Sequence, residues 1–337
     1  MIEEKYMQRC IQLALKGKGK VAPNPMVGCV IVYKNNIIGE GFHSQYGGAH
    51  AEVNAIDSVL DKTLLPLSTV YVSLEPCAHF GKTPPCVNLL IAHKVKKVVI
   101  GCVDTFSKVA GKGIALLKAT GMDVEIGILE QGCRDLNRAF FTFHEKIRPY
   151  IILKWAETVN GYMAGERKQI SGNNAQLLLH KWRSEEQAFL IGTYTLMQDN
   201  PQLNSRHFSH KNPIRIVIDF DLKSEGKNLH FLDNKQATVI LNRHKNETLN
   251  TIQYVKIDNK EPQTIVNALY HIDIQSVVIE GGKQLLESFI NAKLVDEYRV
   301  FTSKKNTFID GLKAPKFKAQ LKQTIVLGED ILNIYFK

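Results

Sequence analysis

The feature that most constrains the fold of this chain is an alternation of short apolar runs with amphipathic segments. The runs VGCVIVY, TVYVSLEP and VKKVVIGCVD have the length and composition of buried strands. Between the first two lies HAEVNAIDSVLDK, which predicts a helix beginning at His50, with one apolar face made of Val53, Ile56, Val59 and Leu60. Strands that alternate with helices indicate an α/β sheet.

The rest of the first half fits the same class. The stretch VGCVIVYKNNIIGEGFH predicts a hairpin whose two strands are joined by an Asn-Asn turn. Glycines 111 and 113 mark a loop after the third run, and GMDVEIGILEQGCRDLNRAFFTFHEK predicts a strand followed by one helix. We expect this domain to end near Lys146.

The second half begins a new set of strands. RPYIILKWA predicts a strand, a helix follows around Asn174 to Arg183, and AFLIGTYTL, IRIVIDF, ATVILN and SVVIEGG are further β-rich runs. A chain of 337 residues is long enough for two domains. The sequence therefore predicts two α/β domains, 1–146 and 147–337, without an internal repeat.

The net charge of the chain limits the classes of partner that it could bind. The formal net charge is +10, but the lysines are scattered and are not interleaved with aromatic residues in a compact tract. We therefore expect no nucleic acid as partner. An anionic small substrate accounts for a positive balance equally well, because a phosphate needs only a few placed cations.

No segment predicts a membrane association. The beginning MIEEKYMQRCIQLALKGKG is typical of an amphipathic helix and not of a signal peptide, and no run approaches the roughly 18 apolar residues that span a bilayer. We expect a cytoplasmic protein. In that reducing compartment the six cysteines are interpreted as metal ligands or buried thiols, the latter for Cys10, Cys29, Cys102 and Cys133.

Three residues have the pattern of a catalytic zinc site. His50 opens a predicted helix, Cys77 follows a strand and a proline, and Cys86 ends the loop PCAHFGKTPPC. A catalytic zinc takes three protein ligands and keeps a fourth position for water, so one histidine and two cysteines suffice. Glu52, two residues after the histidine, is suited to move protons between that water and a leaving amine.

The spacing leaves one alternative open. The deaminase signature H-x-E followed by P-C-x-x-C is matched, except that eight residues separate the two cysteines here. A structural zinc would require a fourth protein ligand, for which His79 is available. We interpret His79 instead as a residue that faces the substrate.

Three motifs resemble those of the bifunctional riboflavin-biosynthesis deaminase/reductase family. They are APNPMVG at 22–28, GFHSQYGGAHAE at 41–52 and LEPCAHFGKTPPC at 74–86, and the long cysteine spacing resembles that family's own. The resemblance implies a cytidine-deaminase-like α/β/α domain that hydrolyses the 2-amino group of a diaminopyrimidinone carrying a ribosylamino 5-phosphate. It implies substrate contacts by Asn24, His43, His79 and Lys82. The alternatives are a turn residue for Asn24 and a solvated loop residue for Lys82.

The second half resembles the reductase domain of the same family. The matching stretches are RPYIILKWA at 148–156, GTYTLMQDNPQLNSR at 192–206 and VVIEGGKQLL at 277–286. The resemblance implies a dihydrofolate-reductase-like fold that reduces the ribose of the deaminated product with hydride from NADPH. By itself, IEGGKQLL predicts a strand, a turn and a helix N-terminus, a place that can hold a phosphate.

The resemblance also assigns residues in this half. The cofactor contacts would be Gly282, Lys283, Gln284, Leu285, Leu286, Glu287 and Ser288, together with Ala156, Thr195 and Asp199. The substrate contacts would be Arg183, Leu203, Arg206 and Glu280, since a guanidinium binds phosphate bidentately. Asp199 is the candidate catalytic carboxylate near the ribose, with an Asx turn or helix cap as its alternative.

The chain departs from the family pattern in three places. Thr158-Val159-Asn160-Gly161 stands where S-L-D-G is usual, Arg167-Lys168-Gln169 where a tryptophan is common, and Asp104-Thr105-Phe106-Ser107 where D-P-N-P is usual. Two other readings remain: a deaminase with a non-catalytic C-terminal domain, and a deaminase of nucleic-acid bases. We expect a homo-oligomer, as is common for catalytic α/β sheets.

Overall fold

The computed structural model describes residues 2–80, 84–106, 111–165, 169–208 and 211–337. The chain divides into two compact units, Met1–Ile147 and Arg148–Lys337. Each unit has a sheet and a hydrophobic core of its own, so the α/β class expected for both halves is confirmed. Among the described residues, no helix is long and apolar enough to cross a membrane.

The first unit contains a five-stranded sheet in the order β2-β1-β3-β4-β5. The first two strands form the predicted hairpin, and β3, β4 and β5 run parallel to one another. Parallel strands deliver their following loops to one edge of the sheet, which is where the candidate site lies. The strands are β1 (Gly28–Tyr33), β2 (Asn36–Phe42), β3 (Thr69–Leu74), β4 (Lys97–Cys102) and β5 (Asp123–Ile126).

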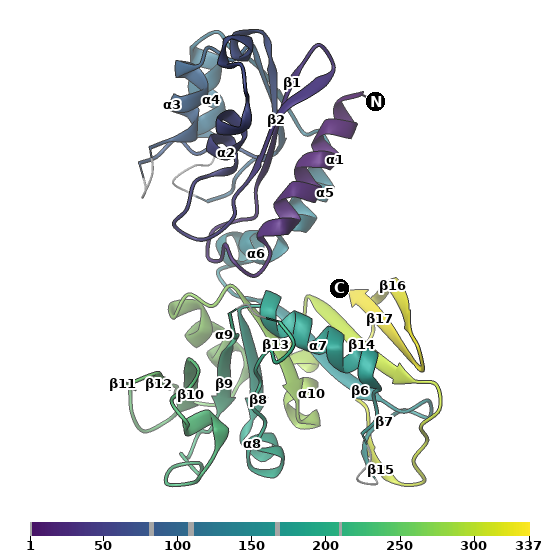
Figure 1. Cartoon of the computed structure of the whole chain (residues 1–337). Coiled ribbons are helices and arrows are strands. Elements are labelled where there is room, and N and C mark those ends of the chain that lie inside the picture. The colour runs from purple at the N-terminus through teal and green to yellow at the C-terminus, as the bar shows by residue number, and fades with distance from the viewer. Residues whose placement is uncertain (1, 81–83, 107–110, 166–168, 209–210) are drawn as a thin grey trace. The chain divides into compact units, whose positions relative to one another are not determined.

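Helices cover both faces of this sheet (Figure 1). Along β1, Cys29 and Ile31 pack in the core shared with α2 and α3, whereas Val30 and Val32 pack in the core shared with α1 and α5. Because successive side chains of a strand point to opposite faces, a run that is apolar throughout is buried on both faces. The helices are α1 (Ile2–Ala14), α2 (Ala51–Ser58), α3 (Cys86–Ala92), α4 (Lys112–Ala119), α5 (Glu130–Leu136) and α6 (Arg138–Lys146), with 3₁₀ turns η1 (Leu15–Gly17) and η2 (Lys62–Leu67).

Several local expectations are wrong. The run AFLIGTYTL is a strand only as far as Gly192, since Thr193–Asp199 is helical, and Gly113 lies inside the helix Lys112–Ala119 instead of in a loop. The hairpin turn is formed by Lys34 and Asn35, both with positive φ, so it lies one residue earlier than the Asn-Asn pair. Helix α2 ends at Ser58 because Val59 is extended, and Leu60 is fully exposed instead of lying on the apolar face. The single helix expected before Lys146 is divided at Asn137, whose side chain hydrogen-bonds both the backbone N–H and the carbonyl of Met26.

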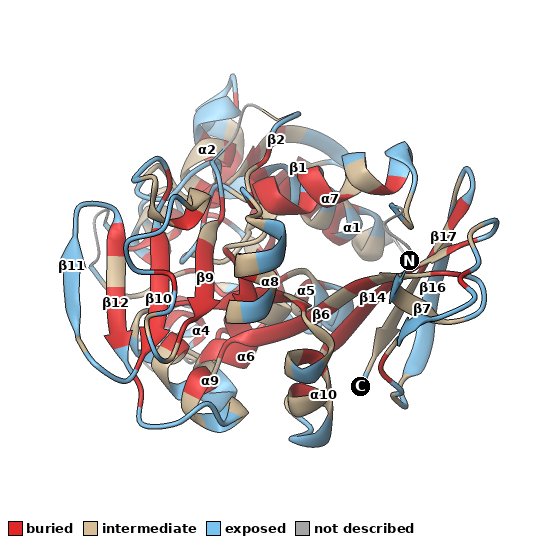
Figure 2. Cartoon of the chain, turned by 90° about the horizontal axis from the view of Figure 1, so that it is seen from below, coloured by how far each residue is buried: buried red, intermediate tan, exposed pale blue. Residues whose placement is uncertain are grey.

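The second unit is organised around a ten-stranded sheet, and Figure 2 shows its central strands buried and β11 exposed. The order is β11-β12-β10-β9-β8-β13-β6-β14-β17-β16, and the seven strands from β12 to β14 are parallel. These seven are β6 (Tyr150–Glu157), β8 (Ala188–Gly192), β9 (Ile214–Ile218), β10 (Thr238–Asn242), β12 (Ile252–Lys256), β13 (Ser276–Gly281) and β14 (Glu297–Ser303).

The remaining strands and the helices complete this unit. β11 (Glu247–Leu249), β16 (Gln320–Leu327) and β17 (Asp330–Phe336) pair antiparallel at the sheet edges, and β7 (Tyr162–Gly165) pairs with β15 (Gly311–Lys313). The helices are α7 (Asn173–Glu185), α8 (Thr193–Asp199), α9 (Pro262–His271) and α10 (Lys283–Asn291), with a 3₁₀ turn η3 (His230–Leu232). The carboxyl ends of β6, β8 and β13 therefore lie side by side, and a ligand is expected at such an edge.

Candidate functional sites

The first site begins at the start of α2. His50 is the N-terminal capping residue of this helix and has extended backbone angles, so its side chain projects from the helix end. Glu52 lies in the first turn of the helix and its side chain is buried. Burial raises the pKa of Glu52 to about 7, with a further rise from the neighbouring Cys77 sulfur.

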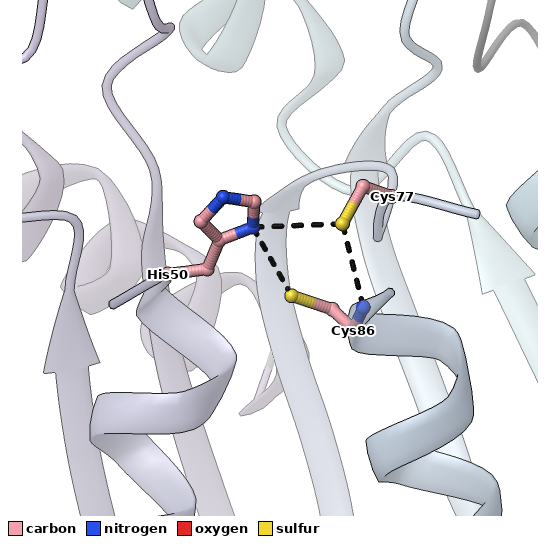
Figure 3. A group of neighbouring side chains, drawn as sticks. All are labelled: His50, Cys77 and Cys86. Carbon is pink, nitrogen blue, oxygen red and sulfur yellow. Dashed lines mark hydrogen bonds between the residues drawn. The ribbon is translucent and has the colours of Figure 1, made fainter. Parts of the chain in front are cut away.

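Two loops bring the sulfur atoms to His50. Cys77 follows β3, and Cys86 is the first residue of α3. His50 Nδ1 lies 3.2 Å from Cys86 Sγ and 3.5 Å from Cys77 Sγ, and the Cys86 backbone N–H donates to Cys77 Sγ (Figure 3). The candidate ligand atoms all lie within 4.8 Å of one another.

This geometry fits a tetrahedral zinc ion. Zinc bonds of about 2.1 Å to nitrogen and about 2.3 Å to sulfur place tetrahedral ligand atoms about 3.6 Å apart. The neighbouring Cys86 side chain lowers the pKa of Cys77 to about 4, and Cys77 together with burial raises the pKa of Cys86. Among the described residues the group has three members, His50, Cys77 and Cys86, the number of protein ligands that a catalytic zinc takes.

The residues expected to contact the substrate are placed as follows. Asn24 Nδ2 lies 3.1 Å from Nε2 of His43, whose ring packs edge-on against the ring of His50. His79 lies beyond Cys77, and its Nδ1 is buried without a hydrogen-bond partner among the described residues. Lys82 lies outside the described residues. The structure thus brings Asn24 and His43 to the zinc-ligand group.

The segment after β4, named above as a departure from the family pattern, contains two residues to which sequence reasoning assigned no role in the site. Asp104 is buried, and burial raises its pKa to about 6, with neighbouring Glu75 and Cys77 adding to the rise. The Phe106 ring packs against the rings of His79 and His144. The sequence did contain a signal for a site role, because Asp104 and Phe106 follow β4, which is adjacent to β3, the strand that precedes Cys77.

The second site lies at the carboxyl edge of the larger sheet. Glu280, near the end of β13, lies 3.3 Å from Arg183 Nη2 and 3.8 Å from Lys154 Nζ; Arg183 is buried, and the side chains of Lys154 and Glu280 are only 13% and 12% exposed. Burial lowers the pKa of Lys154 against the opposing effect of Glu280. Arg183 Nε and Glu280 Oε1 have no hydrogen-bond partner among the described residues. Lys154 was not predicted as a site residue, although a lysine within an apolar strand was the signal.

Arg206 lies close to the group formed by Lys154, Arg183 and Glu280, and His180 lies between them in the contact chain. His180 is buried on α7, one turn before Arg183, and its Nε2 lies 3.3 Å from Arg206 Nη2. Leu203 is buried, with its backbone in the left-handed region. Asp199 is the last residue of α8 and is exposed, although the protein around its carboxyl group removes part of the water and so raises its pKa. The structure therefore gathers Arg183, Arg206 and Glu280, while Asp199 lies at the nearby end of α8.

The expected cofactor residues surround the turn into α10. Gly282 caps this helix, and a side chain added there would come within 3.6 Å of Thr195 Oγ1, so the turn lies against α8. Ala156 lies near the end of β6, which is adjacent to β13. Leu286 packs in the hydrophobic core, so only its backbone could contact a ligand. Asn160, one of the departures from the family pattern, instead bonds the backbone of Phe308.

Comparisons with known proteins agree with this arrangement. The family described as the RibD C-terminal domain matches residues 149–332, and the cytidine and deoxycytidylate deaminase zinc-binding region matches residues 1–102. The riboflavin biosynthesis protein RibD of Aquifex aeolicus is 34% identical over 354 residues, which cover 100% of this chain and 98% of that protein. The chain belongs to the RibD family.

Other RibD proteins are similar over nearly the whole length. RibD of Actinobacillus pleuropneumoniae is 35% identical over 99% of this chain and 95% of its own. The crystal structure of the Thermotoga maritima diaminohydroxyphosphoribosylaminopyrimidine deaminase/5-amino-6-(5-phosphoribosylamino)uracil reductase has a TM-score of 0.91 and 32% identity, and the match covers 99% of this chain and 98% of that one. The chain is a bifunctional riboflavin-biosynthesis enzyme with a zinc-binding deaminase domain and a reductase domain, which implies a nicotinamide cofactor.

Proposed function

We propose that the first unit hydrolyses 2,5-diamino-6-(5-phosphoribosylamino)pyrimidin-4(3H)-one at its 2-amino carbon, and that the second unit reduces the ribosyl group of the product to ribityl with NADPH. The observation that carries the proposal is the grouping of His50, Cys77 and Cys86 beside the buried carboxyl group of Glu52. Zinc held by these three ligands would supply Lewis-acid activation of a water molecule.

Glu52 is proposed as the proton carrier of the deaminase unit. Its carboxylate accepts a proton from the attacking water and delivers it to the departing amino group, which leaves as ammonia while a carbonyl forms on the ring. Its position in the first turn of α2, two residues after His50, places it next to the ligand group. Asn24 and His79 are proposed to bind the pyrimidine ring, and Lys82 to bind the phosphate.

The second unit supports a reductase role through its charges. Arg183 and Arg206 are proposed to bind the substrate phosphate, with Glu280 and Leu203 nearby and Asp199 as the carboxylate near the ribose. Arg183 Nε and Glu280 Oε1 are buried and have no hydrogen-bond partner among the described residues, which is consistent with polar atoms that bind a ligand. The turn at Gly282–Ser288, with Ala156, Thr195 and Asp199, is proposed to hold the nicotinamide cofactor.

A cytoplasmic location and a homo-oligomeric state are proposed as well. Reduced Cys77 and Cys86 are needed as ligands and all six cysteines are free, which supports a cytoplasmic location. An exposed edge strand, β16, with Val326 on its surface, supports a homo-oligomer, which sedimentation velocity would test.

One experiment tests the two activities together. The zinc-loaded protein is incubated with the proposed substrate while ammonia release and NADPH oxidation are followed, with Glu52→Gln as the variant. We expect ammonia release followed by NADPH oxidation in the wild type, and neither in the variant. Deaminated substrate should restore NADPH oxidation in the variant, without ammonia release. Ammonia without NADPH oxidation would favour a non-catalytic second domain, and ammonia only from single-stranded nucleic acid would favour a base deaminase.

A further inference from the structure

A buried carboxylate next to the zinc-ligand loop has no role in the chemistry proposed above. Glu75 lies two residues before Cys77, and its side chain is only 4% exposed. Its two oxygens accept four backbone N–H groups. Oε1 accepts from Gly113 at 2.9 Å and Ile114 at 3.2 Å, and Oε2 accepts from Gly111 at 3.0 Å and Asp104 at 3.2 Å.

These bonds replace the missing cap of α4. The capping residue of this helix, Gly111, has a positive φ and no side chain that could accept a hydrogen bond. The N–H groups of the first helical turn must then find another acceptor, and Glu75 supplies it from a distant part of the chain. The negative charge is also favourable at the N-terminus of a helix.

Residues 75 and 76 pack so closely against Gly113 that a side chain there would clash with them. A Cβ added at Gly113 would lie 2.2 Å from the Pro76 carbonyl oxygen and 3.1 Å from Glu75 Oε1. Residues 75 and 76, immediately before the ligand Cys77, are therefore packed directly against the start of α4. The Glu75 backbone N–H also donates to the Cys102 carbonyl, which ties the same residues to the end of β4.

Asp104 links the Glu75 carboxylate to Phe106. Asp104 Oδ1 in turn accepts the backbone N–H of Phe106, whose ring packs against that of His79. Thr105, between them, has a buried hydroxyl without a hydrogen-bond partner among the described residues. One carboxylate thus joins the metal-ligand loop to a segment that presents an aromatic ring and an unpaired polar atom.

We infer that Glu75 is a positioning residue of the deaminase: it fixes segment 104–106 relative to the Cys77 loop, so that this segment forms a wall of the pyrimidine pocket. The inference rests on the proposed function of the first unit. Residues that orient a metal site from behind its ligands commonly change activity when they are replaced. Glu75 hydrogen-bonds the backbone of this wall and does not touch the proposed substrate. Its loss should therefore change the shape of the pocket, and so act mainly on substrate binding.

The test is Glu75→Gln in the full-length, zinc-loaded protein. A glutamine places an NH₂ group against two backbone N–H donors, so one pair of the four bonds is lost. We expect the KM of deamination to rise roughly 10- to 100-fold with kcat much less affected. The cobalt(II)-substituted variant should keep the wild-type absorption spectrum, because the ligands are unchanged.

The control variants separate positioning from folding. Gly113→Ala disturbs the same contact without altering charge and should raise KM in the same way, whereas Asp57→Asn, at an exposed position on α2, should not. Reduction of the deaminated intermediate by the second unit should be unchanged throughout. A wild-type KM in Glu75→Gln, or loss of metal or of folding in the first unit, overturns the inference. Absence of deamination in the wild type would instead refute the proposed function.

Discussion

His43 Nε2 lies 3.1 Å from Asn24 Nδ2, while the other ring nitrogen of His43, Nδ1, lies 3.0 Å from the Ala49 carbonyl oxygen. A carbonyl oxygen only accepts, so Nδ1 carries the hydrogen and donates it. In the neutral ring Nε2 must then accept from the Asn24 amide, and burial favours this neutral form by lowering the pKa of His43. The anchored amide leaves Asn24 Oδ1 as the atom that can accept from the substrate.

This arrangement predicts that Asn24→Asp damages substrate binding although the side chain keeps its shape. Aspartate has no N–H to donate, so His43 Nε2 must take up a proton and the neutral tautomer is lost. We expect the KM of deamination to rise about 10-fold or more, since a neutral hydrogen bond is replaced by a pair of charges in a largely buried place. Nitrogen NMR of the zinc-loaded protein should show the Nδ1–H tautomer of His43 in the wild type alone. Asn36→Asp, in the exposed hairpin, is the control, and an unchanged tautomer in Asn24→Asp would contradict the arrangement.

Removal of zinc should separate the two activities. The ligand group lies wholly within Met1–Ile147, and the second unit has its own core. We expect chelation to abolish deamination and to leave reduction of the deaminated intermediate intact. Mass spectrometry under native conditions should count one zinc per chain in the wild type and in Cys133→Ser, and none in Cys86→Ser. Retention of zinc by Cys86→Ser would show that another residue completes the site.

The Glu280 cluster gives a prediction for the second unit. Glu280→Gln removes the carboxylate that faces two largely buried cations, Lys154 and Arg183. A buried charge that loses its partner costs about 3 kcal/mol or more. We expect the free energy of unfolding of the second unit to fall by about this amount and reduction to be lost, while deamination stays unchanged.

Urea denaturation followed through the tryptophan fluorescence measures the change, because Trp155 and Trp182 both lie in the second unit. Glu247→Gln is the control, since Glu247 pairs with Lys245 at a solvent-exposed position on β11. An unfolding free energy of Glu280→Gln equal to that of the wild type would show that Glu280 does not stabilise Lys154 and Arg183 in the folded protein.

The zinc site could be predicted from sequence because each ligand is marked locally. His50 begins a helix, Cys77 follows a strand and a proline, and Cys86 begins another helix. The same local reasoning failed at Leu60, where the helical period was extended past the last helical residue. It also failed at Asn137, where hydrogen bonds to Met26, 111 residues away in the sequence, interrupt a continuous amphipathic pattern.

Interactions between neighbouring strands could not be predicted either, because their partners are also distant in the sequence. Lys154 and Glu280 lie on neighbouring strands β6 and β13, which are more than 100 residues apart in the chain. Glu75 meets its four donors 29 to 39 residues further on. A periodicity reports which face of an element is buried, but not which element covers it, so the partners of these charged residues emerge only from the fold.

Cofactor preference can be predicted from a group of residues at the carboxyl ends of the parallel strands. Phe220 follows β9, Arg243 follows β10 and Lys260 comes after β12, so all three lie at the edge that also carries Gly282. The Arg243 guanidinium lies 5.3 Å and the Lys260 ammonium 5.6 Å from the centre of the Phe220 ring. From β13 to β10 is three strand spacings, roughly 14 Å, a span that an extended dinucleotide crosses.

An aromatic ring with two cations suits an adenine that carries a 2′-phosphate, which NADPH has and NADH lacks. Arg243 is paired with Asp221 at the surface, an ion pair that a phosphate could replace at small cost. We expect Arg243→Ala combined with Lys260→Ala to raise the KM for NADPH about 10-fold or more, because two charge-assisted contacts are lost, and to leave the KM for NADH unchanged. Binding of 2′,5′-ADP, measured by calorimetry, should weaken in parallel, whereas binding of 5′-AMP should not. The matched control is Arg138→Ala combined with Lys146→Ala, two cations of the first unit. If the double variant at 243 and 260 keeps wild-type affinity for 2′,5′-ADP, the phosphate is bound elsewhere along this edge.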